Sequence, residues 1–333
     1  MPDRPRLFLL TTGGTIASRR DATTGAVATA ANGQELTDLV PELGELADLH
    51  VEAFASVNSW NMTPLMMLDL ATRVNRVLDQ PEITAALVTH GTDTVEETAF
   101  LLDLIVASPK PVVFVVAMRN LSEPGADGPR NLLDAAKVAL DPGARDRGAL
   151  LVVSETIHTA RHVTKMNTVN PSTFESPDHG PAGNTGGGVV RFFHSPQPRQ
   201  LIPTVEIDPE VLLIKVAAGT DARQFHWAIE TGYRGIVIEG SGAGNVPAAM
   251  VPGIETTIAA GLPVVLTSRC PFGFLAPVYG SGGAAGGGWD LQRLGVIFAD
   301  HLPAQKARIK LMVALGLTSE IEEIRTLFSP RAP

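Results

Sequence analysis

A buried strand that runs into a glycine turn is predicted by the segment LFLLTTGG, residues 7–14. Further short apolar runs read as strands, and they lie at residues 51–57, 86–89, 112–116 and 150–153. Helical patterns fill the gaps between these runs, so strand and helix alternate along the chain. Because parallel neighbours need a long crossover, which is usually a helix, this alternation indicates a parallel, doubly wound sheet.

Apolar residues at helical spacing support this alternation. One stripe, with spacings of three and four, runs through Leu65, Leu68, Ala71, Val74 and Leu78. Thr63 and Pro64 precede it and suit the N-cap and the first helical position. A second helix is predicted near residues 95–106, where Asp93 and Glu96 have the spacing of a capping box. A third is predicted at residues 131–140.

The alternation stops between residues 180 and 203, which contain the runs GNTGGG and SPQPRQLIP. It then restarts, with strands predicted at 211–216, 235–239 and 264–267 and helices at 221–231, 247–260, 303–315 and 319–328. We therefore expect an N-terminal domain over residues 1–190, a linker over 191–210 and a C-terminal α/β domain over 211–333.

Composition excludes several classes of protein. The 333 residues include 44% hydrophobic and 18% charged residues, which excludes wholesale disorder. A net charge of −9 argues against nucleic acid or an anionic membrane as the main partner. The single cysteine, Cys270, excludes an internal disulfide framework. The sequence has no apolar run of about 18 residues and no recognisable signal peptide, so a cytoplasmic location is expected.

Three predicted strands end in unusual polar sequence: TTGGTIAS at residues 11–18, NSWNM at 58–62 and THGTDT at 89–94. Ligands of open α/β sheets bind outside the carboxyl ends of the strands, so we expect these segments to converge. The first is not a dinucleotide fingerprint, since G-x-G-x-x-G and G-x-x-x-x-G-K-[ST] are both absent. Taken alone, its two glycines could form a plain turn.

Four residues in these segments and in RHVTKMNT, residues 161–168, suit acyl transfer: Thr15, Thr92, Asp93 and Lys165. A hydroxyl is a weak nucleophile until a base removes its proton. A desolvated lysine can be that base, and a carboxylate can orient it. The alternatives are that Asp93 only caps a helix and that Lys165 is simply solvated. His90 is interpreted as a structural neighbour.

At this point the chain resembles the bacterial L-asparaginase/glutaminase family that uses threonine nucleophiles. Two stretches carry most of the resemblance, TGGTIA at residues 12–17 and HGTDTVEETA at residues 90–99. It continues through VTKMNT (163–168), GSGAGNVP (240–247), SRCPFG (268–273) and PAQKARIKL (303–311). The resemblance therefore spans nearly the whole chain, in order.

The resemblance implies roles for individual residues. Thr15 would be the nucleophile, and Thr92, Asp93 and Lys165 would activate it or the attacking water, through a threonyl acyl-enzyme or by direct water attack. Ser59 would bind the substrate α-carboxylate, and Asp93 would also face the α-ammonium. Asn245 would approach the site from the second domain. The family forms homodimers, often paired into homotetramers, in which a neighbouring subunit completes each site.

The predicted fold class is α/β, with a larger N-terminal doubly wound, flavodoxin-like parallel sheet and a smaller C-terminal α/β domain. Three departures from the family pattern concern substrate recognition. Trp60 stands where the family has a glutamine that grips the head group. The lid segment, residues 18–33, lacks the family's tyrosine. The acidic loop is replaced by YGSGGAAGGGWD, residues 279–290, in which Asp290 is the only carboxylate. The missing hydroxyl could come from Tyr279, from Thr23 or Thr24 in the lid, or from water. Tyr279 could equally be an ordinary loop aromatic that packs on Pro277.

The leading functional hypothesis is an amidohydrolase of asparagine metabolism that converts L-asparagine to L-aspartate and ammonia. A broader glutaminase or amidase is the first alternative, because one methylene is worth only ~1–3 kcal/mol in a pocket. A non-catalytic amino-acid-binding protein is the second. We expect no metal, since His158 and His162 lack a third ligand nearby in sequence, and no organic cofactor. The expected partners are a small amino-acid substrate and further copies of the chain, with no nucleic acid and no membrane.

Overall fold

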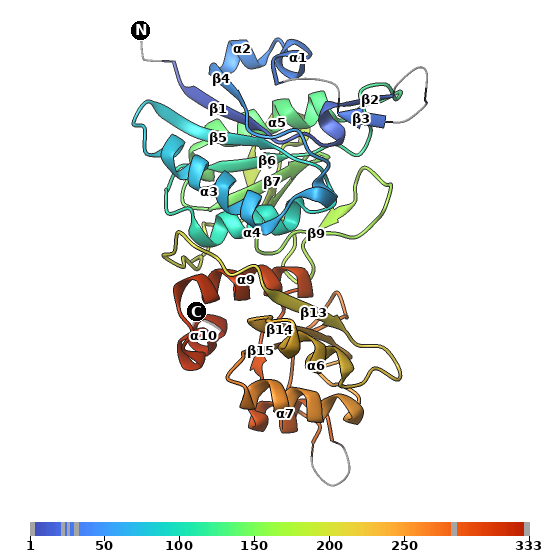
Figure 1. Ribbon diagram of the computed structural model, residues 1–333. Coiled ribbons are helices and arrows are strands. Elements are labelled where there is room, and N and C mark those ends of the chain that lie inside the picture. The colour runs from blue at the N-terminus through green and yellow to red at the C-terminus, as the bar shows by residue number, and fades with distance from the viewer. Residues whose placement is uncertain (1–3, 21–23, 25–26, 30–32, 281–284, 330–333) are drawn as a thin grey trace. The chain divides into compact units, whose positions relative to one another are not determined.

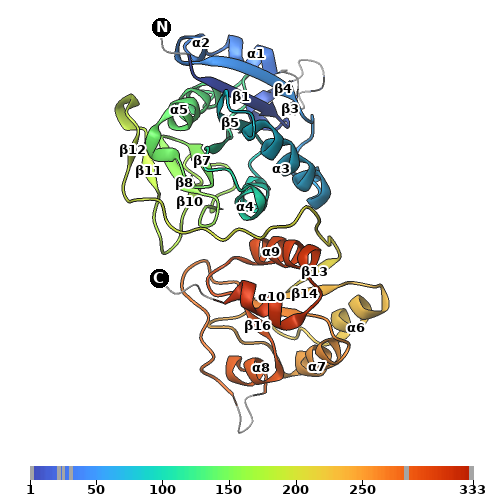
Figure 2. The same cartoon turned by 90° about the vertical axis from the view of Figure 1, so that its left-hand side faces the viewer.

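The computed structural model describes residues 4–20, 24, 27–29, 33–280 and 285–329. The chain divides into two compact units, residues 1–201 and residues 202–333 (Figures 1 and 2). Each unit has its own sheet and its own core. The α/β class and the two-domain organisation are thus confirmed, while the boundaries 1–190 and 211–333 stay a prediction.

The first unit is built on an eight-stranded sheet in the order β12-β11-β8-β7-β6-β5-β1-β4. Five strands are parallel to one another: β1 (Arg6–Thr11), β4 (Asp48–Ala53), β5 (Ile83–Thr89), β6 (Val112–Val115) and β7 (Ala149–Val153). In space these five strands follow the order β4-β1-β5-β6-β7, so β4, which comes second along the chain, lies outside β1. This is the strand order of the flavodoxin-like sheet. The doubly wound prediction is therefore confirmed for this half.

The other half of the sheet is antiparallel, which corrects the expectation of a purely parallel sheet. It comprises β8 (Thr156–Thr159), β11 (Gly183–Asn184) and β12 (Arg191–Phe192). Ser154 and Glu155 alone connect β7 to β8, and both have positive φ, 48° and 61°. Such two-residue turns make hairpins, but they usually carry Asn-Gly or Asp-Gly. Because Ser154-Glu155 is not one of these pairs, the sequence did not indicate a hairpin at this position.

Helices cover both faces of this sheet (Figures 1 and 2). Side chains of α5 (Gly128–Leu140) pack with Leu7, Leu9 and Leu87 in one core cluster. On the other face lie α3 (Pro64–Leu78) and α4 (Val95–Ile105). The predicted start of α3 is confirmed, because the Thr63 hydroxyl accepts a hydrogen bond from the Met66 amide. Leu65, however, is exposed rather than part of the buried stripe.

Strand β4 begins and ends earlier than the predicted strand at residues 51–57. Beyond Ala53 the chain bends, since the amides of Phe54 and Ala55 both donate to the Thr11 carbonyl. Two donors on one acceptor break the regular ladder. The apolar pattern that predicted the strand therefore extends to residue 57, although the regular strand pairing ends at Ala53.

Shorter elements complete the first unit. They are α1 (Gly33–Asp38), α2 (Leu43–Leu46), the β2–β3 hairpin (Ser18–Arg20, Val27–Thr29) and the β9–β10 ribbon (Thr164–Lys165, Phe174–Glu175). Single 3-10 turns lie at Thr15–Ala17, Ser59–Asn61, Pro142–Ala144 and Gly186–Gly188. The 3-10 turn that begins at Thr15 and the β9–β10 ribbon both carry predicted site residues.

The second unit has a four-stranded parallel sheet in sequential order, β13 (Val211–Lys215), β14 (Gly235–Gly240), β15 (Val264–Ser268) and β16 (Ile297–Phe298). Its helices are α6 (Arg223–Glu230), α7 (Val251–Ala259), α8 (Gly288–Leu294), α9 (Ala304–Leu317) and α10 (Ile321–Phe328), with a 3-10 turn at Ala248–Met250. This arrangement confirms the predicted smaller α/β domain and adds β16 and α8. Within the described residues, no helix combines the length and apolar character needed to cross a membrane.

Candidate active site

Three loops of the first unit meet where β1 and β5 end. Both strands are parallel neighbours, and the chain leaves them toward opposite sides of the sheet, which is the switch point of a doubly wound fold. A Cβ atom added to Gly14 would lie 2.5 Å from Gly91 Cα, and one added to Gly91 would lie 2.6 Å from Ser59 Oγ. The three polar segments predicted to converge are therefore in direct contact.

Glycine is required at Gly14 for the conformation as well as the contact. Its φ and ψ are 86° and 179°, a region that only glycine occupies readily. The turn then delivers Thr15 at the start of a 3-10 helix, half-buried, with Ile16 buried beside it. The Ser18 hydroxyl donates to the Gly14 carbonyl at 2.8 Å. The backbone thus presents Thr15 from the loop that follows β1.

The Thr92 hydroxyl lies at the tip of the opposing loop and contacts Lys165. Lys165 Nζ is 2.8 Å from Thr92 Oγ1 and 2.6 Å from Asp93 Oδ1. The Thr92 side chain is buried, while the side chains of Lys165 and Asp93 are 16% and 45% exposed. Lys165 comes from β9, more than 70 residues away in sequence. The structure therefore brings together the threonine, lysine and carboxylate singled out from the sequence.

Ser59 is buried against the same loop. Its hydroxyl oxygen accepts a hydrogen bond from the Asp93 amide at 3.1 Å, and its carbonyl accepts one from the Thr94 hydroxyl at 2.7 Å. A hydroxyl that accepts one hydrogen bond can still donate its own proton to an acceptor such as a carboxylate. Trp60, the next residue, is 66% exposed.

The capping box predicted from Asp93 and Glu96 is wrong. The N-cap of α4 is Thr94, whose side chain makes no capping hydrogen bond. The Asp93 carboxylate is instead engaged by Lys165, and the Glu96 carboxylate accepts hydrogen bonds from Thr164 and from the Lys165 amide. Asp93 and Glu96 have the spacing of a capping box, but both carboxylates bind residues of the distant strand β9 instead of capping the helix. No local pattern could have revealed the role of Glu96.

His90 is completely buried behind this loop. Its Nδ1 lies 2.8 Å from the Gly91 carbonyl and its Nε2 lies 3.0 Å from the Thr98 hydroxyl. Because a carbonyl only accepts, Nδ1 carries the proton and Nε2 accepts from Thr98. Burial lowers the His90 pKa to about 4, so the ring is neutral at physiological pH. These contacts agree with a structural role for His90.

The second unit holds two more of the predicted site residues, Asn245 and Tyr279. The Asn245 side-chain carbonyl accepts a hydrogen bond from the Gly288 amide at 3.2 Å. The Tyr279 carbonyl accepts one from the Trp289 amide, and its side chain is exposed. The two residues thus lie beside the start of α8, within one group of loops. Of the lid candidates, Thr23 lies outside the described residues, and so do residues 281–284 of the glycine-rich loop.

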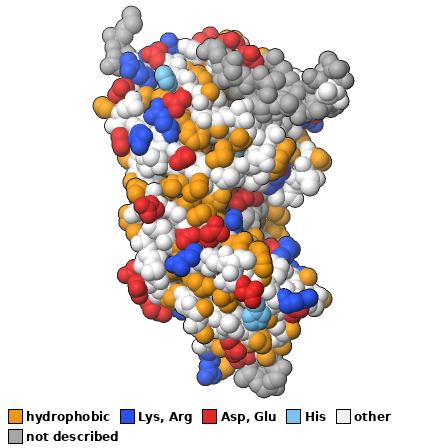
Figure 3. Space-filling view, in the orientation of Figure 1, with side chains coloured by type: hydrophobic (Ala, Val, Ile, Leu, Met, Phe, Trp, Pro, Cys, Tyr) orange, Lys and Arg blue, Asp and Glu red, His pale blue; other side chains and the backbone are white. Residues whose placement is uncertain are grey.

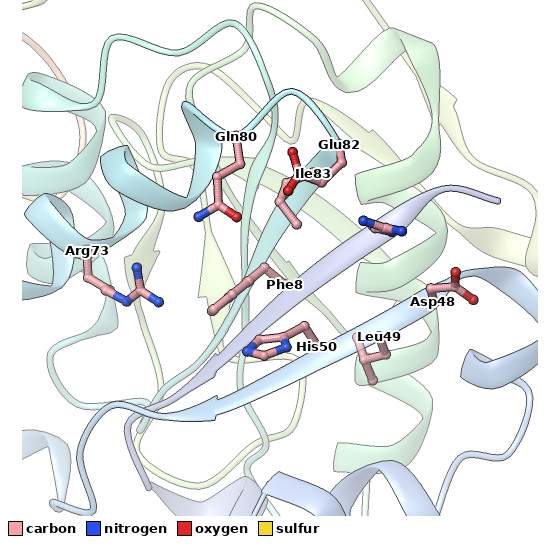
Figure 4. A pocket seen from close by; sticks show the side chains of 9 residues that line it. Phe8, Asp48, Leu49, His50, Arg73, Gln80, Glu82 and Ile83 are labelled. Carbon is pink, nitrogen blue, oxygen red and sulfur yellow. The ribbon is translucent and has the colours of Figure 1, made fainter. Parts of the chain in front are cut away.

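A cavity of about 430 Å³ lies at the opposite ends of the strands from these loops, where β1, β4 and β5 begin (Figure 4). Arg73 engages Glu52 through two hydrogen bonds of 2.8 and 2.6 Å and lies over the Phe8 ring. The hydrogen bond from Arg73 is the main cause that holds the Glu52 pKa below its ordinary value. None of the three converging loops lines this cavity, so the cavity is separate from the candidate active site.

The face of the molecule seen in Figure 3 carries acidic and basic side chains interspersed. A mixed surface of this kind provides no single-sign field for a polyanion. The surface in this view therefore agrees with the composition in offering no basic patch.

Comparison with known proteins places this geometry in a family. The model of the asparaginase N-terminal domain matches residues 6–198, and that of the glutaminase/asparaginase C-terminal domain matches residues 210–328. The chain is 39% identical to a probable L-asparaginase of Deinococcus radiodurans, over 98% of this chain and 97% of that protein. It is 33% identical to L-asparaginase 2 of Bacillus subtilis, over 98% of this chain and 87% of that protein.

A solved structure supports the same conclusion at the level of the fold. The crystal structure of a probable cytoplasmic L-asparaginase from Campylobacter jejuni matches with a TM-score of 0.87 and 32% identity. The match covers 98% of this chain and 99% of that one. The matches cover both domains and nearly all of this sequence, and the chain belongs to the asparaginase family.

Proposed function

We propose that the protein hydrolyses the side-chain amide of L-asparagine to L-aspartate and ammonia. The observation that carries the proposal is the position of Lys165 Nζ, within hydrogen-bond distance of both Thr92 and Asp93. The loop that presents Thr15 abuts the loop of Thr92, since Gly14 lies against Gly91. Two hydroxyls and an amine around one junction suit acyl transfer through an oxygen nucleophile.

The proposed reaction has two halves. In the first, the Thr15 oxygen attacks the amide carbon, the C–N bond breaks, and ammonia leaves with the proton that Thr15 loses. In the second, water attacks the resulting ester, its proton passes to the threonyl oxygen, and L-aspartate is released. Backbone N–H groups near Thr92 would stabilise the oxyanion of both intermediates, a contribution of about 3 kcal/mol per donor.

Lys165 and Thr92 would manage the protons. In the proposed step Lys165 Nζ accepts the Thr92 proton, and the Thr92 oxygen then acts as the base toward the attacking group. The Asp93 carboxylate keeps the lysine in place at 2.6 Å. Attack by water in place of Thr15 would use the same base and would leave no ester on the enzyme.

Head-group recognition is assigned to Ser59 and Asp93. The Ser59 hydroxyl accepts from the Asp93 amide, so its proton is oriented away and can donate to an α-carboxylate. The partly exposed Asp93 carboxylate suits an α-ammonium. Trp60, whose side chain is exposed, stands where the family has a glutamine, so head-group recognition would be altered or moved to other residues.

We also propose a homodimer or homotetramer in the cytoplasm, with Asn245 and Tyr279 completing a neighbour's site. A group of exposed apolar side chains in the second unit supports an assembly: Phe272, Phe274, Val278, Tyr279 and Trp289. Contiguous exposed apolar side chains commonly mark interaction surfaces, and these five lie close together in the sequence. Sedimentation at nanomolar concentration tests the idea, because a fully active monomer would exclude a shared site.

Ammonia release from L-asparagine and L-glutamine is the direct test of the function. The wild-type enzyme should release ammonia from L-asparagine faster than from L-glutamine, and the Thr15→Ala variant should release it from neither. A reversed preference would favour the broader glutaminase. Binding of either amino acid without ammonia release would instead identify a non-catalytic binding protein.

A further inference from the structure

The Glu96 carboxylate connects two segments that are far apart in sequence. Glu96 lies in the first turn of α4 and is only 6% exposed. The Thr164 hydroxyl donates to one of its oxygens, and the Lys165 amide donates to the other at 3.4 Å. Both donors belong to β9, 68 and 69 residues further along the chain. A buried carboxylate thus ties the base of α4 to the strand that carries the lysine.

We propose that Glu96 is a positioning residue that holds Lys165 in reach of Thr92 and Asp93. Strand β9 consists of two residues and, within the described part of the chain, pairs with the equally short β10 alone, so its own ladder fixes it weakly. Lys165 is held at two points, at its backbone amide by Glu96 and at its Nζ by Thr92 and Asp93. All three partners belong to one loop–helix junction, so the contacts form a closed circuit.

The circuit explains why a carboxylate occupies this buried position. Its two oxygens can accept from a hydroxyl and from an amide at once, which an apolar side chain could not do. Removing it leaves both donors without this acceptor and releases β9 from α4. A displacement of about 1 Å in a catalytic group can cost roughly 100-fold in rate. Loss of Glu96 should therefore act on the chemical step more than on substrate binding.

Substitutions can separate geometry from charge. Glu96→Ala removes both acceptors. Glu96→Gln keeps one oxygen for the Lys165 amide and offers an N–H that the Thr164 hydroxyl can accept. Glu97→Gln is the matched control, because it removes the same charge from the same turn of α4 and has the same effect on the helix dipole.

The inference rests on the proposed catalytic role of Lys165, and the kinetics should be measured in both Lys165 backgrounds. In the wild-type background, Glu96→Ala should lower kcat about 10- to 100-fold with less than a threefold change in KM. Glu96→Gln should stay within about threefold of wild-type kcat, and Glu97→Gln should leave it unchanged. In a Lys165→Met background, Glu96→Ala should add no further loss, because residues that act as a unit are not additive.

Several outcomes would overturn the positioning role. One is a folded Glu96→Ala enzyme with kcat within twofold of wild type beside an inactive Lys165→Met enzyme. Another is a loss that multiplies with that of Lys165→Met, or an equal loss in Glu97→Gln. Wild-type turnover in Lys165→Met would overturn the proposed catalytic role of Lys165, and a wild-type enzyme that releases no ammonia would overturn the proposed function. If Glu96→Ala does not fold, Thr164→Val removes one donor only and should lower kcat in the wild-type background alone.

Discussion

The loops that carry Thr15 and Thr92 abut each other but are held in different ways. The Thr15 loop depends on backbone conformation, with glycines at positive φ and a 3-10 turn that presents the hydroxyl. The Thr92 loop depends on side chains, and it is tied to Ser59, to Lys165 and, through His90, to Thr98. This difference suits the proposed division of labour, in which Thr15 is the nucleophile and the Thr92 loop holds the base.

The largest effect should come from the loop that carries Thr15, the proposed nucleophile. Thr15→Ala should lower kcat by about 10³-fold or more, because the attacking oxygen is lost. Thr15→Ser keeps the oxygen and is the matched control, so it should retain substantial turnover. Both enzymes should melt near the wild-type temperature, since Thr15 is half-buried in a loop. An alanine variant with more than a few per cent of wild-type kcat would place the nucleophile elsewhere.

The second loop should respond as one unit. Lys165→Met keeps the aliphatic stem and removes the amine, and Thr92→Ala removes the hydroxyl that lies 2.8 Å from it. We expect each to lower kcat by roughly 10²- to 10³-fold, and the double variant to be no slower than the slower single one. Steady-state kinetics on all three enzymes checks this expectation. Multiplied losses would show that Lys165 works apart from Thr92, for example by attracting substrate through its charge.

The junction between the loops should be sensitive to a single methyl group. In Gly14→Ala the new Cβ would meet Gly91 backbone atoms at 2.5 Å, in a glycine-only conformation. Gly219 also has a positive φ, 84°, but nothing lies within 4 Å of such a Cβ, so Gly219→Ala is the control for a positive φ in open space. Denaturant unfolding should show a loss of about 3 kcal/mol for Gly14→Ala and about 1 kcal/mol for Gly219→Ala. An equal decrease in the free energy of unfolding for the two variants would show that the close contact between Gly14 and Gly91 adds no cost.

The smallest effect concerns the pH dependence of the histidine behind the second loop. The His90 pKa is about 4 when folded and 6.5 by its ordinary value, so the unfolded chain binds the proton first as the pH falls. His90 therefore contributes stability that is complete above pH 6.5 and is lost as the pH falls toward 4. Between pH 7 and 5 this contribution should decrease by about 2 kcal/mol.

His90→Gln supplies the control for that measurement, because glutamine can hydrogen-bond Thr98 but does not titrate. The free energy of unfolding of wild type and variant should be compared at several pH values between 7 and 5. The difference between the two enzymes should shrink as the pH falls. A constant difference would show that His90 binds its proton equally well in the folded and unfolded chain.

Much of the fold could be predicted because its signals are local. The α3 cap at Thr63, the parallel strands and the polar strand ends all lie in short stretches of sequence. The features that escaped depend on distant contacts or on rare turns. Glu96 looked like a capping residue because its real partner, β9, is 68 residues away. The β7–β8 hairpin was missed because Ser154 and Glu155 adopt positive φ without the usual turn residues.

The contact between Lys165 and Thr92 shows the same limit. Sequence could propose that the two residues cooperate, but only the path of the β9–β10 ribbon places Nζ within 2.8 Å of the hydroxyl. A lone lysine in a threonine-rich segment is otherwise a typical solvated residue. Prediction was therefore strongest where strands end and weakest where irregular segments return to them.

The division of labour between the two loops can be tested on the wild-type enzyme during turnover. The enzyme should be mixed with L-asparagine, quenched in acid within the first turnovers, digested, and mapped by mass spectrometry for aspartyl esters. We expect an ester on the peptide that carries Thr15 and none on the peptide that carries Thr92. An ester on Thr92, or product formation in the first turnover with no ester on either threonine, would contradict it.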